Sequence, residues 1–265
     1  MTGTTEADLA RQVRAGWEQL TAPYGQPRAR FSVPLRVTAS AGSGICPPGW
    51  IGIVTIGGAV LATAPDQASA LAVQGAMASV PLARVTDPDV LRTRLPVVDL
   101  LGPASLAYLA PGPDSPGLGA DEPGADEPGA DEPQLAELSP QDPSLRDFLA
   151  AADPAERDES GLAGITSPAF AVTRSGRVLS AAGYRRWPNG FAHLCVLTAA
   201  DARGGGLARL GGAAAVGHAL AAGLLPQWRA RLEPSRAVAR SLGFADLGHQ
   251  VSLRIGDDQN LRSAR

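Results

Sequence analysis

The pattern of apolar and polar positions divides the first 110 residues into helices and strands. Apolar residues recur every three or four positions near the start and again after Asp66, which is typical of amphipathic helices. Short apolar runs bounded by glycine or proline lie between and after them, which is typical of strands. The pattern predicts helices over 4–20 and 66–79 and strands over 31–38, 50–56, 59–64 and 97–109. Residues 1–110 are therefore expected to form an N-terminal α+β lobe.

Residues 111–143 break this pattern. The sequence Gly-Ala-Asp-Glu-Pro occurs three times in succession, at 119–123, 124–128 and 129–133. Each repeat carries one alanine as its only apolar group, so it has nothing to bury and nothing to stack into a solenoid. We therefore predict that 111–143 is a disordered acidic linker that serves as a spacer.

The pattern of elements returns after the linker. It predicts helices over 144–152, 206–223 and 235–242 and strands over 170–174, 177–184, 191–198, 225–231 and 250–255. This order corresponds to a mixed sheet with crossover helices, which makes the C-terminal half an α/β domain. We expect that domain to comprise 144–256, followed by a tail at 257–265.

Composition and charge exclude several classes of function. The chain has no lysine, and all 23 basic residues are arginine. A P-loop nucleotide site needs a lysine on the phosphates, so that class is excluded. The formal net charge is −3 and many of the acids lie in the linker, so the excess of arginine elsewhere is too small to indicate nucleic-acid binding. The bias toward Ala, Gly, Pro and Arg indicates a bacterial coding sequence.

Cysteine usage and hydropathy indicate a protein of the reducing cytoplasm. Cys46 and Cys195 form no disulfide framework, and they do not lie at metal-ligand spacing from the three histidines, so no metal site is expected. No basic segment followed by an apolar run is visible near the start. The most apolar stretch, 210–226, is short and interrupted by His218, so no membrane association is expected.

The most informative segment connects the strand at 191–198 to the helix at 206–223. It reads Arg203-Gly204-Gly205-Gly206-Leu207-Ala208, with Arg209 next. Three glycines allow successive backbone N–H groups to point at one ligand, and the helix start adds unsatisfied N–H donors and a positive dipole. The loop thus predicts a phosphate or pyrophosphate site. A dinucleotide fingerprint is excluded because Arg209 stands where its last glycine would be. Helix–sheet packing remains the structural alternative for these glycines.

The loop and its context resemble the GNAT acyltransferase superfamily. The signature of that family is Arg/Gln-x-x-Gly-x-Gly/Ala, and Arg203, Gly206 and Ala208 match it. The strand at 192–198 resembles the fourth strand of the family, and 235–244, which ends in Leu-Gly-Phe, resembles a later helix. The resemblance implies a GNAT fold over about 155–255. The N-terminal lobe matches no motif, and a degenerate copy of the same fold is one interpretation of it.

The resemblance also implies a cofactor and its site. The cofactor would be acetyl-CoA or another acyl-CoA. Backbone N–H groups of Val196 and Thr198 would bind the pantetheine arm where strands 191–198 and 225–231 splay apart, and those of 204–209 would hold the pyrophosphate. The expected cofactor-binding residues are Val196, Leu197, Thr198, Arg203, Gly204, Gly205, Gly206, Leu207, Ala208 and Arg209.

The implied activity is N-acyl transfer by direct attack of an amine on the thioester. Among the acyl groups, acetyl is the first candidate. The acceptor would be a small molecule or a peptide, and assembly as a homodimer is compatible with the sequence. Many members of the family protonate the departing thiolate with a tyrosine, but Ala239 occupies that position here. Glu159 and His193 are weak candidates for proton transfer. The structural alternative is a solvated surface charge for Glu159 and a hydrogen-bonded core histidine for His193.

Three further residues near this segment have structural interpretations. Cys195 is expected to be a buried, inert thiol. Trp187 and Trp228 could line an acceptor pocket, but large aromatic residues more often belong to the core. Because the tyrosine is absent, a non-catalytic acyl-CoA-binding or regulatory module remains the alternative function.

Overall fold

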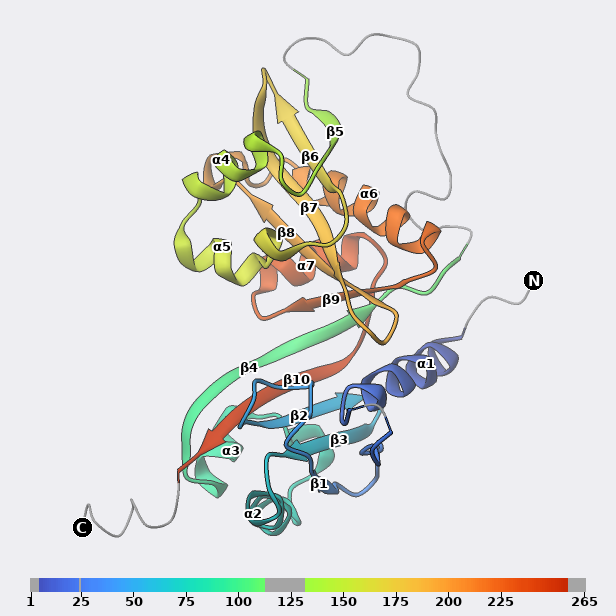
Figure 1. The fold of residues 1–265 in the computed structure, drawn as a ribbon, viewed down its shortest axis with the longest axis vertical. Coiled ribbons are helices and arrows are strands. Elements are labelled where there is room, and N and C mark those ends of the chain that lie inside the picture. The colour runs from blue at the N-terminus through green and yellow to red at the C-terminus, as the bar shows by residue number, and fades with distance from the viewer. Residues whose placement is uncertain (1–4, 24, 113–131, 257–265) are drawn as a thin grey trace. The chain divides into compact units, whose positions relative to one another are not determined.

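The structure, a computed structural model, describes residues 5–23, 25–112 and 132–256 (Figure 1). Most of the repeat segment and the tail at 257–265 lie outside the described residues, so the expectation of disorder there stays a prediction. The chain divides into two compact units. The N-terminal unit comprises Thr5–Ala107, Ala230–Leu232 and the residues from Asp246 onward, and the C-terminal unit comprises Tyr108–Arg229 and Glu233–Ala245.

The N-terminal unit is an α+β structure. Its elements are α1 (Glu6–Gln19), β1 (Val37–Ala39), β2 (Ile51–Ile56), β3 (Ala59–Ala64), α2 (Gln67–Met77), the 3₁₀ turn η1 (Leu82–Arg84), α3 (Pro88–Arg94), β4 (Val97–Tyr108) and β10 (Ala245–Ile255). The strands lie in the order β1-β3-β2-β10-β4. The strands expected at 50–56 and 59–64 are confirmed, and β2 and β3 pair antiparallel on either side of Gly57-Gly58 as a hairpin. Leu35, Ile53, Val73 and Leu91 belong to the apolar core that α2 and α3 share with this sheet.

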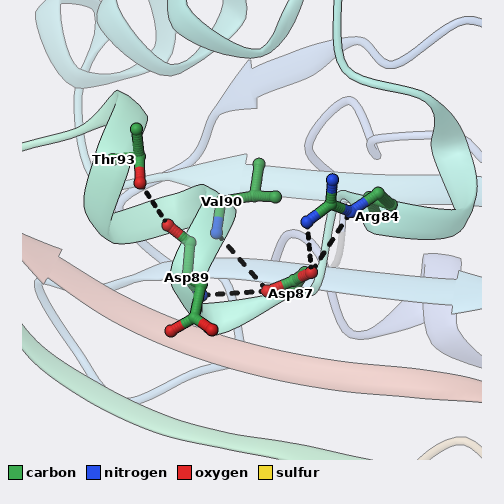
Figure 2. Close-up of polar contacts among 5 residues, drawn as sticks. All are labelled: Arg84, Asp87, Asp89, Val90 and Thr93. Carbon is green, nitrogen blue, oxygen red and sulfur yellow. Dashed lines mark hydrogen bonds and ion pairs between the residues drawn. The ribbon is translucent and has the colours of Figure 1, made fainter.

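The start of α3 shows how local sequence defines an element here (Figure 2). The carboxylate of Asp87 caps the helix by accepting hydrogen bonds from the backbone N–H groups of Asp89 and Val90 at 2.9 and 3.4 Å. Pro88 follows it at the first helical position, where no N–H is needed. Arg84 donates to the same carboxylate at 2.9 Å. This hydrogen bond, with the others, holds the pKa of Asp87 below its usual value.

The C-terminal unit is a mixed α/β structure. Its elements are β5 (Gln134–Leu138), α4 (Pro143–Ala151), α5 (Pro154–Ser160), the 3₁₀ turn η2 (Leu162–Gly164), β6 (Ala169–Arg174), β7 (Arg177–Arg186), β8 (Phe191–Thr198), the 3₁₀ turn η3 (Ala200–Ala202), α6 (Leu207–Ala221), β9 (Leu225–Ala230) and α7 (Glu233–Ser241). The strands lie in the order β9-β8-β7-β6-β5. Strands β5 to β8 are antiparallel, and β9 is parallel to β8 with α6 as the crossover. The expected mixed sheet is confirmed.

Opposite faces of this sheet pack against different helices. Leu145 and Phe148 of α4 form a core with Ala181 of β7 and Cys195 of β8. Helix α6 lies against the other face, where alternating side chains such as Ala182 point. It approaches closely because Gly211 has no side chain: a Cβ there would lie 3.0 Å from the carbonyl oxygen of Phe170.

Several element boundaries differ from the expected ones. The strand expected at 31–38 contributes only its last two residues to β1 (Val37–Ala39), while Ser32 makes a single bridge to Val60. Pro34 lies between these two short contacts, and a proline has no N–H to donate to a ladder. The acidic stretch after Asp153 is a helix, α5, because Asp153 caps it and Pro154 opens it.

The expected domain limits also differ from the two units. Residues 134–138, placed in the linker by composition, form β5 and pair antiparallel with β6. Leu135 and Leu138 interrupt the polar composition there, which supplies the apolar side chains that the repeats lack. At the other end, β10 pairs with β2 over Gly248–Leu253, so most of the last strand belongs to the N-terminal unit and not to a domain ending at 256.

Candidate functional site

The glycine loop turns directly into helix α6. Gly204 and Gly206 have φ values of 82° and 74°, a conformation that side-chain-bearing residues rarely adopt. Gly206 is the residue just before the helix. No protein atom lies within 4 Å of the position a Cβ would take on either residue. The glycines here therefore satisfy the backbone conformation, and the packing alternative, which needs a close neighbour, does not explain them.

Backbone donors are exposed at this turn. Residues 203–206 are exposed, and the first hydrogen bonds of the helix run from Arg209 and Leu210 to the carbonyl oxygen of Gly206. Among the described residues, none accepts a hydrogen bond from the N–H groups of Gly206, Leu207 or Ala208. These donors lie at the positive end of a helix of 15 residues. The loop therefore has the chemistry to bind a phosphate or pyrophosphate through its backbone.

The two arginines of the loop have different surroundings. Arg203 donates to the carboxylate of Glu156 on α5 at 2.6 Å, and its Nε donates to the carbonyl oxygen of Thr198 at 3.4 Å. Its charge is thus already balanced by an acid, which the sequence did not reveal. Arg209 is exposed on the first turn of α6. Both side chains lie at the surface, so their contribution to anion binding is a screened charge.

Strands β8 and β9 separate at the point that the resemblance implied. Their parallel register runs from Phe191 opposite Leu225 to His193 opposite Gln227. β8 then continues to Thr198 and β9 to Ala230 without further pairing between them. The edge of β8 beyond His193 therefore has backbone groups that β9 does not use.

The ladder with β7 shows which groups these are. Ala199 donates its N–H to the carbonyl oxygen of Leu179 at 2.8 Å, so Ala199 and Leu179 form a hydrogen-bonded pair across β7 and β8. Because N–H directions alternate along an antiparallel ladder, Leu197 also points its N–H toward β7. Val196 and Thr198 then point theirs away from β7, toward the gap. These are the two residues expected to bind the pantetheine arm, while Leu197 is turned into the core.

His193 lies at the last paired position before the strands separate. Its Nδ1 lies 3.2 Å from Oε1 of Gln227, and its ring lies 5.3 Å from that of Trp187. Burial is the main cause that lowers its pKa to about 4, and the positive charges of Arg229 and Arg185 act in the same direction. The imidazole is therefore neutral at physiological pH and able to accept a proton.

Other candidates from the sequence have defined positions. Cys195 is buried, and burial raises the pKa of its thiol to about 11, so it is protonated and unreactive. Trp228 is also buried, donates to Ser235 at 3.0 Å and packs edge-on against Phe244, so it belongs to the core. Trp187, in contrast, is only half-buried and lies beside His193. Glu159 is exposed near the end of α5.

Sequence reasoning missed two polar residues of this region. Gln227 was placed only as part of a strand, and Tyr108 as the end of an apolar segment. Both are fully buried, and Nε2 of Gln227 donates to the hydroxyl of Tyr108 at 2.6 Å. A glutamine within an apolar strand is a weak signal of a buried hydrogen-bond network, but the distance of Tyr108 along the chain leaves no signal for its partner.

No cluster of three or more histidine, cysteine, aspartate or glutamate side chains within 5–23, 25–112 and 132–256 could hold a metal ion. In the same residues, no helix has the length and apolar character needed to cross a bilayer.

Comparison with solved structures gives distant similarities. A GNAT-family acetyltransferase from Colwellia psychrerythraea is 15% identical over 70% of this chain and 71% of its own, with a TM-score of 0.45. A GNAT-family protein from Novosphingobium aromaticivorans is 21% identical over 59% of this chain, with a TM-score of 0.41, and the match spans only 65% of its length. A GCN5-related N-acetyltransferase-like protein from Streptococcus suis is 15% identical over 94% of this chain and all of its own, with a TM-score of 0.45.

A search of curated proteins found no significant match. Residues 168–249, in contrast, match the sequence profile of the GNAT acetyltransferase family. That segment contains β6, β7, β8, α6, β9 and α7, and with them the glycine loop and the separation of β8 from β9. Sequence profile, sheet order and loop geometry agree, and residues 168–249 are therefore similar to the GNAT acetyltransferase family.

Proposed function

We propose that this protein transfers an acyl group from acyl-CoA, with acetyl-CoA as the first candidate, to an amine by direct attack. The observation that carries the proposal is that two backbone sites occur in the same unit. One is the open N–H row at the start of α6, and the other is the edge of β8 that β9 leaves unpaired.

The residues present fit an acyl-CoA on chemical grounds. The N–H groups of Gly206, Leu207 and Ala208 suit the negative charge of a pyrophosphate. Those of Val196 and Thr198 suit the amide carbonyl groups of a pantetheine arm, which would continue the ladder as an added strand. When bound, acyl-CoA supplies an activated thioester. The chain itself binds the two ends of the molecule and holds a neutral histidine at the point where the strands part.

A non-catalytic acyl-CoA-binding module is the second candidate. It is favoured by Ala239, which is buried on α7 where many members of the family carry a tyrosine. The absence of the tyrosine hydroxyl as an acid does not by itself abolish acyl transfer, because a thiolate is a tolerable leaving group. The two candidates share the binding site and differ only in turnover.

One set of measurements separates these functions. Acetyl-CoA at about 100 times its dissociation constant should stabilise the folded protein by about 2.7 kcal/mol and so raise its melting temperature, whereas NAD and ATP should have much smaller effects. Thiol release from acetyl-CoA in the presence of a panel of amines then tests turnover. Binding without thiol release favours the regulatory module. Equal stabilisation by NAD would contradict the acyl-CoA site itself.

A further inference from the structure

A hydrogen-bonded chain of three side chains, of which two are fully buried, ends at the separation of β8 and β9. Tyr108, Gln227 and His193 come from three different strands of the chain, β4, β9 and β8. Tyr108 and Gln227 have no solvent-exposed surface. The ring of Tyr108 is also held by an edge-on contact with Phe191, with ring centres 5.5 Å apart. The inner part of this chain is therefore fixed by packing as well as by hydrogen bonds.

The direction of these bonds defines the protonation of the histidine. Gln227 uses its NH₂ group toward the hydroxyl of Tyr108 at 2.6 Å, which turns its carbonyl oxygen toward Nδ1 of His193 at 3.2 Å. A carbonyl oxygen can only accept, so Nδ1 must carry the proton. In a neutral imidazole the other nitrogen, Nε2, then holds a lone pair.

Nε2 is free to act on a ligand. Within the described residues, Nε2 of His193 has no hydrogen-bond partner. The side chain is half-buried, and His193 lies at the last paired position before the gap that Val196 and Thr198 face. The charged groups that act on it are Arg185, on the neighbouring strand β7, and Arg229, two residues along β9. Both are cations, so the surroundings favour a neutral amine over an ammonium.

We propose that Gln227 and Tyr108 are positioning residues, which hold His193 as the Nδ1–H tautomer so that its Nε2 takes the proton of the attacking amine and returns it to the departing sulfur. This inference rests on the proposed acyl transfer and adds a proton path to it. It assigns to one histidine both the base and the acid that the reaction needs, including the acid that Ala239 cannot provide.

Atoms and electrons balance in this step. The amine nitrogen forms a bond to the acyl carbon with its lone pair, and the bond between that carbon and sulfur breaks, with its electron pair leaving on sulfur. The amine proton passes to Nε2 of His193, and the imidazolium gives the same proton to sulfur. The products are an amide and a free thiol, and the histidine is unchanged.

Burial suits His193 to the second half of this cycle. Its imidazolium is a stronger acid than a thiol, because burial lowers the pKa of the imidazolium to about 4, whereas a simple thiol has a pKa of about 8.5. Proton return to sulfur is therefore downhill. The first half is possible because an amine nitrogen that is bonding to the acyl carbon is a far stronger acid than a free ammonium.

NMR tests the positioning without any turnover. Long-range ¹H–¹⁵N correlation distinguishes the two histidine tautomers, and the absence of one signal in His193→Asn identifies His193 among the three histidines. We expect a protonated Nδ1 at pH 7 in the wild type. Gln227→Leu should redistribute the proton toward Nε2, whereas Gln227→Glu should keep it on Nδ1, because a carboxylate also accepts there. A wild-type spectrum with the proton on Nε2 would overturn the proposal.

Kinetics test the proton path. With acetyl-CoA and the best amine of the panel, His193→Asn should lower kcat by at least about 100-fold, and Tyr108→Phe and Gln227→Leu by at least about tenfold, with little change in the KM for acetyl-CoA. Gln227→Glu should retain most of the kcat that Gln227→Leu loses. Tyr184→Phe is the matched control, because it removes a buried hydroxyl bonded to His218 at 2.9 Å and should leave kcat unchanged.

The outcomes separate the two proposals. If the wild type binds acetyl-CoA and shows the Nδ1–H tautomer but releases no thiol with any amine, acyl transfer fails while the positioning holds. If thiol release is robust but His193→Asn or Gln227→Leu retains full kcat, acyl transfer holds and the proton path is wrong.

Discussion

His193 and Cys195 lie two residues apart on β8, and burial changes their chemistry in opposite senses. It lowers the pKa of the imidazole, so that the ring stays neutral and can accept a proton. It raises the pKa of the thiol to about 11, so that the sulfur stays protonated and cannot attack. Each effect penalises the charged form of the group. At the residue scale, burial therefore leaves His193, and not Cys195, as the group able to take part in proton transfer.

The stability of the C-terminal unit should depend on pH through His193. Its pKa is about 6.5 in the unfolded chain and about 4 in the folded one, so the unfolded chain binds more protons between these values. Stability should therefore be fully present above pH 6.5 and be lost as the pH falls toward 4, by at most about 3 kcal/mol. Urea unfolding at pH 7 and pH 5 measures the loss. His193→Asn should show a smaller loss, and an identical one would contradict the assignment.

A second residue-scale prediction concerns Gly206. Because its φ is 74°, Gly206→Val should distort the turn that aims the N–H groups of α6. We expect the affinity for acetyl-CoA to fall at least tenfold, about 1.4 kcal/mol, as measured by calorimetric titration.

Gly176→Val is the matched control for that change. Gly176 has a φ of 77°, in the hairpin turn between β6 and β7, and open space around its Cβ position. Gly176→Val should lower the free energy of unfolding by a similar strain, about 1–2 kcal/mol, without changing the dissociation constant for acetyl-CoA. If both variants lose affinity equally, the loss reflects general destabilisation, and the backbone site is wrong.

At the scale of elements, helix starts are defined by short local motifs. Asp66, Asp87, Asp142 and Asp153 each cap a helix by accepting a backbone hydrogen bond, and the last three are followed by proline. These motifs are visible in sequence. The separation of β8 from β9 is different, because nothing in either strand alone states where the pairing stops. Local motifs thus define where elements start, and partners define how far they pair.

The cap of α3 offers a test at this scale. Asp87→Ala removes both the cap and the acceptor for Arg84, whereas Asp87→Asn keeps a side chain that caps about as well. We expect Asp87→Ala to lower the melting temperature clearly and Asp87→Asn to lower it only slightly. The wild type should also lose part of this advantage as the pH falls through the lowered pKa of Asp87, since the protonated acid pairs less well. A melting temperature equal to the wild type for Asp87→Ala would refute the capping role.

At the scale of the whole molecule, the last strand links the two units. The chain enters the N-terminal unit first, forms the C-terminal unit, and returns to pair β10 with β2. The approach there is close: a Cβ on Gly248 would overlap the carbonyl group of Thr55, so glycine is required. Neither unit is therefore a single continuous segment, and a division of the chain at one linker would cut through the N-terminal unit.

The repeat segment should be dispensable for stability. Each repeat has only an alanine to bury, and β5 begins at Gln134, directly after the third repeat. Deleting the first two repeats, residues 119–128, and keeping the third leaves chain to reach β5. We expect a change of less than about 1 kcal/mol in the free energy of unfolding, mostly from loop entropy, and unchanged acetyl-CoA affinity. Unfolding or loss of binding on deletion would show that the repeats are more than a spacer.

The sequence by itself determined most of the elements and the glycine loop before α6. Apolar periodicity located α1, because a helix with one buried face repeats at its own period. Short apolar runs located β2 and β3, because a strand that is buried on both faces is apolar throughout. The glycines at 204–206 were readable because backbone conformation is a local property that few other residues satisfy. Strand β1 was overestimated and α5 missed, because proline interrupts a ladder in the first case and opens a helix in the second.

Only the tertiary structure decided the rest. Tyr108 and Gln227 are separated by 119 positions, and they meet only because β4 ends beside β9 in the C-terminal unit. Their bond orients the carbonyl group toward His193, and burial then lowers the pKa of that histidine. Both effects depend on which groups lie nearby in space and on how much water is excluded. Neither quantity is a property of a residue or its sequence neighbours, so the sequence could name His193 as a candidate but could not assign its tautomer or its charge.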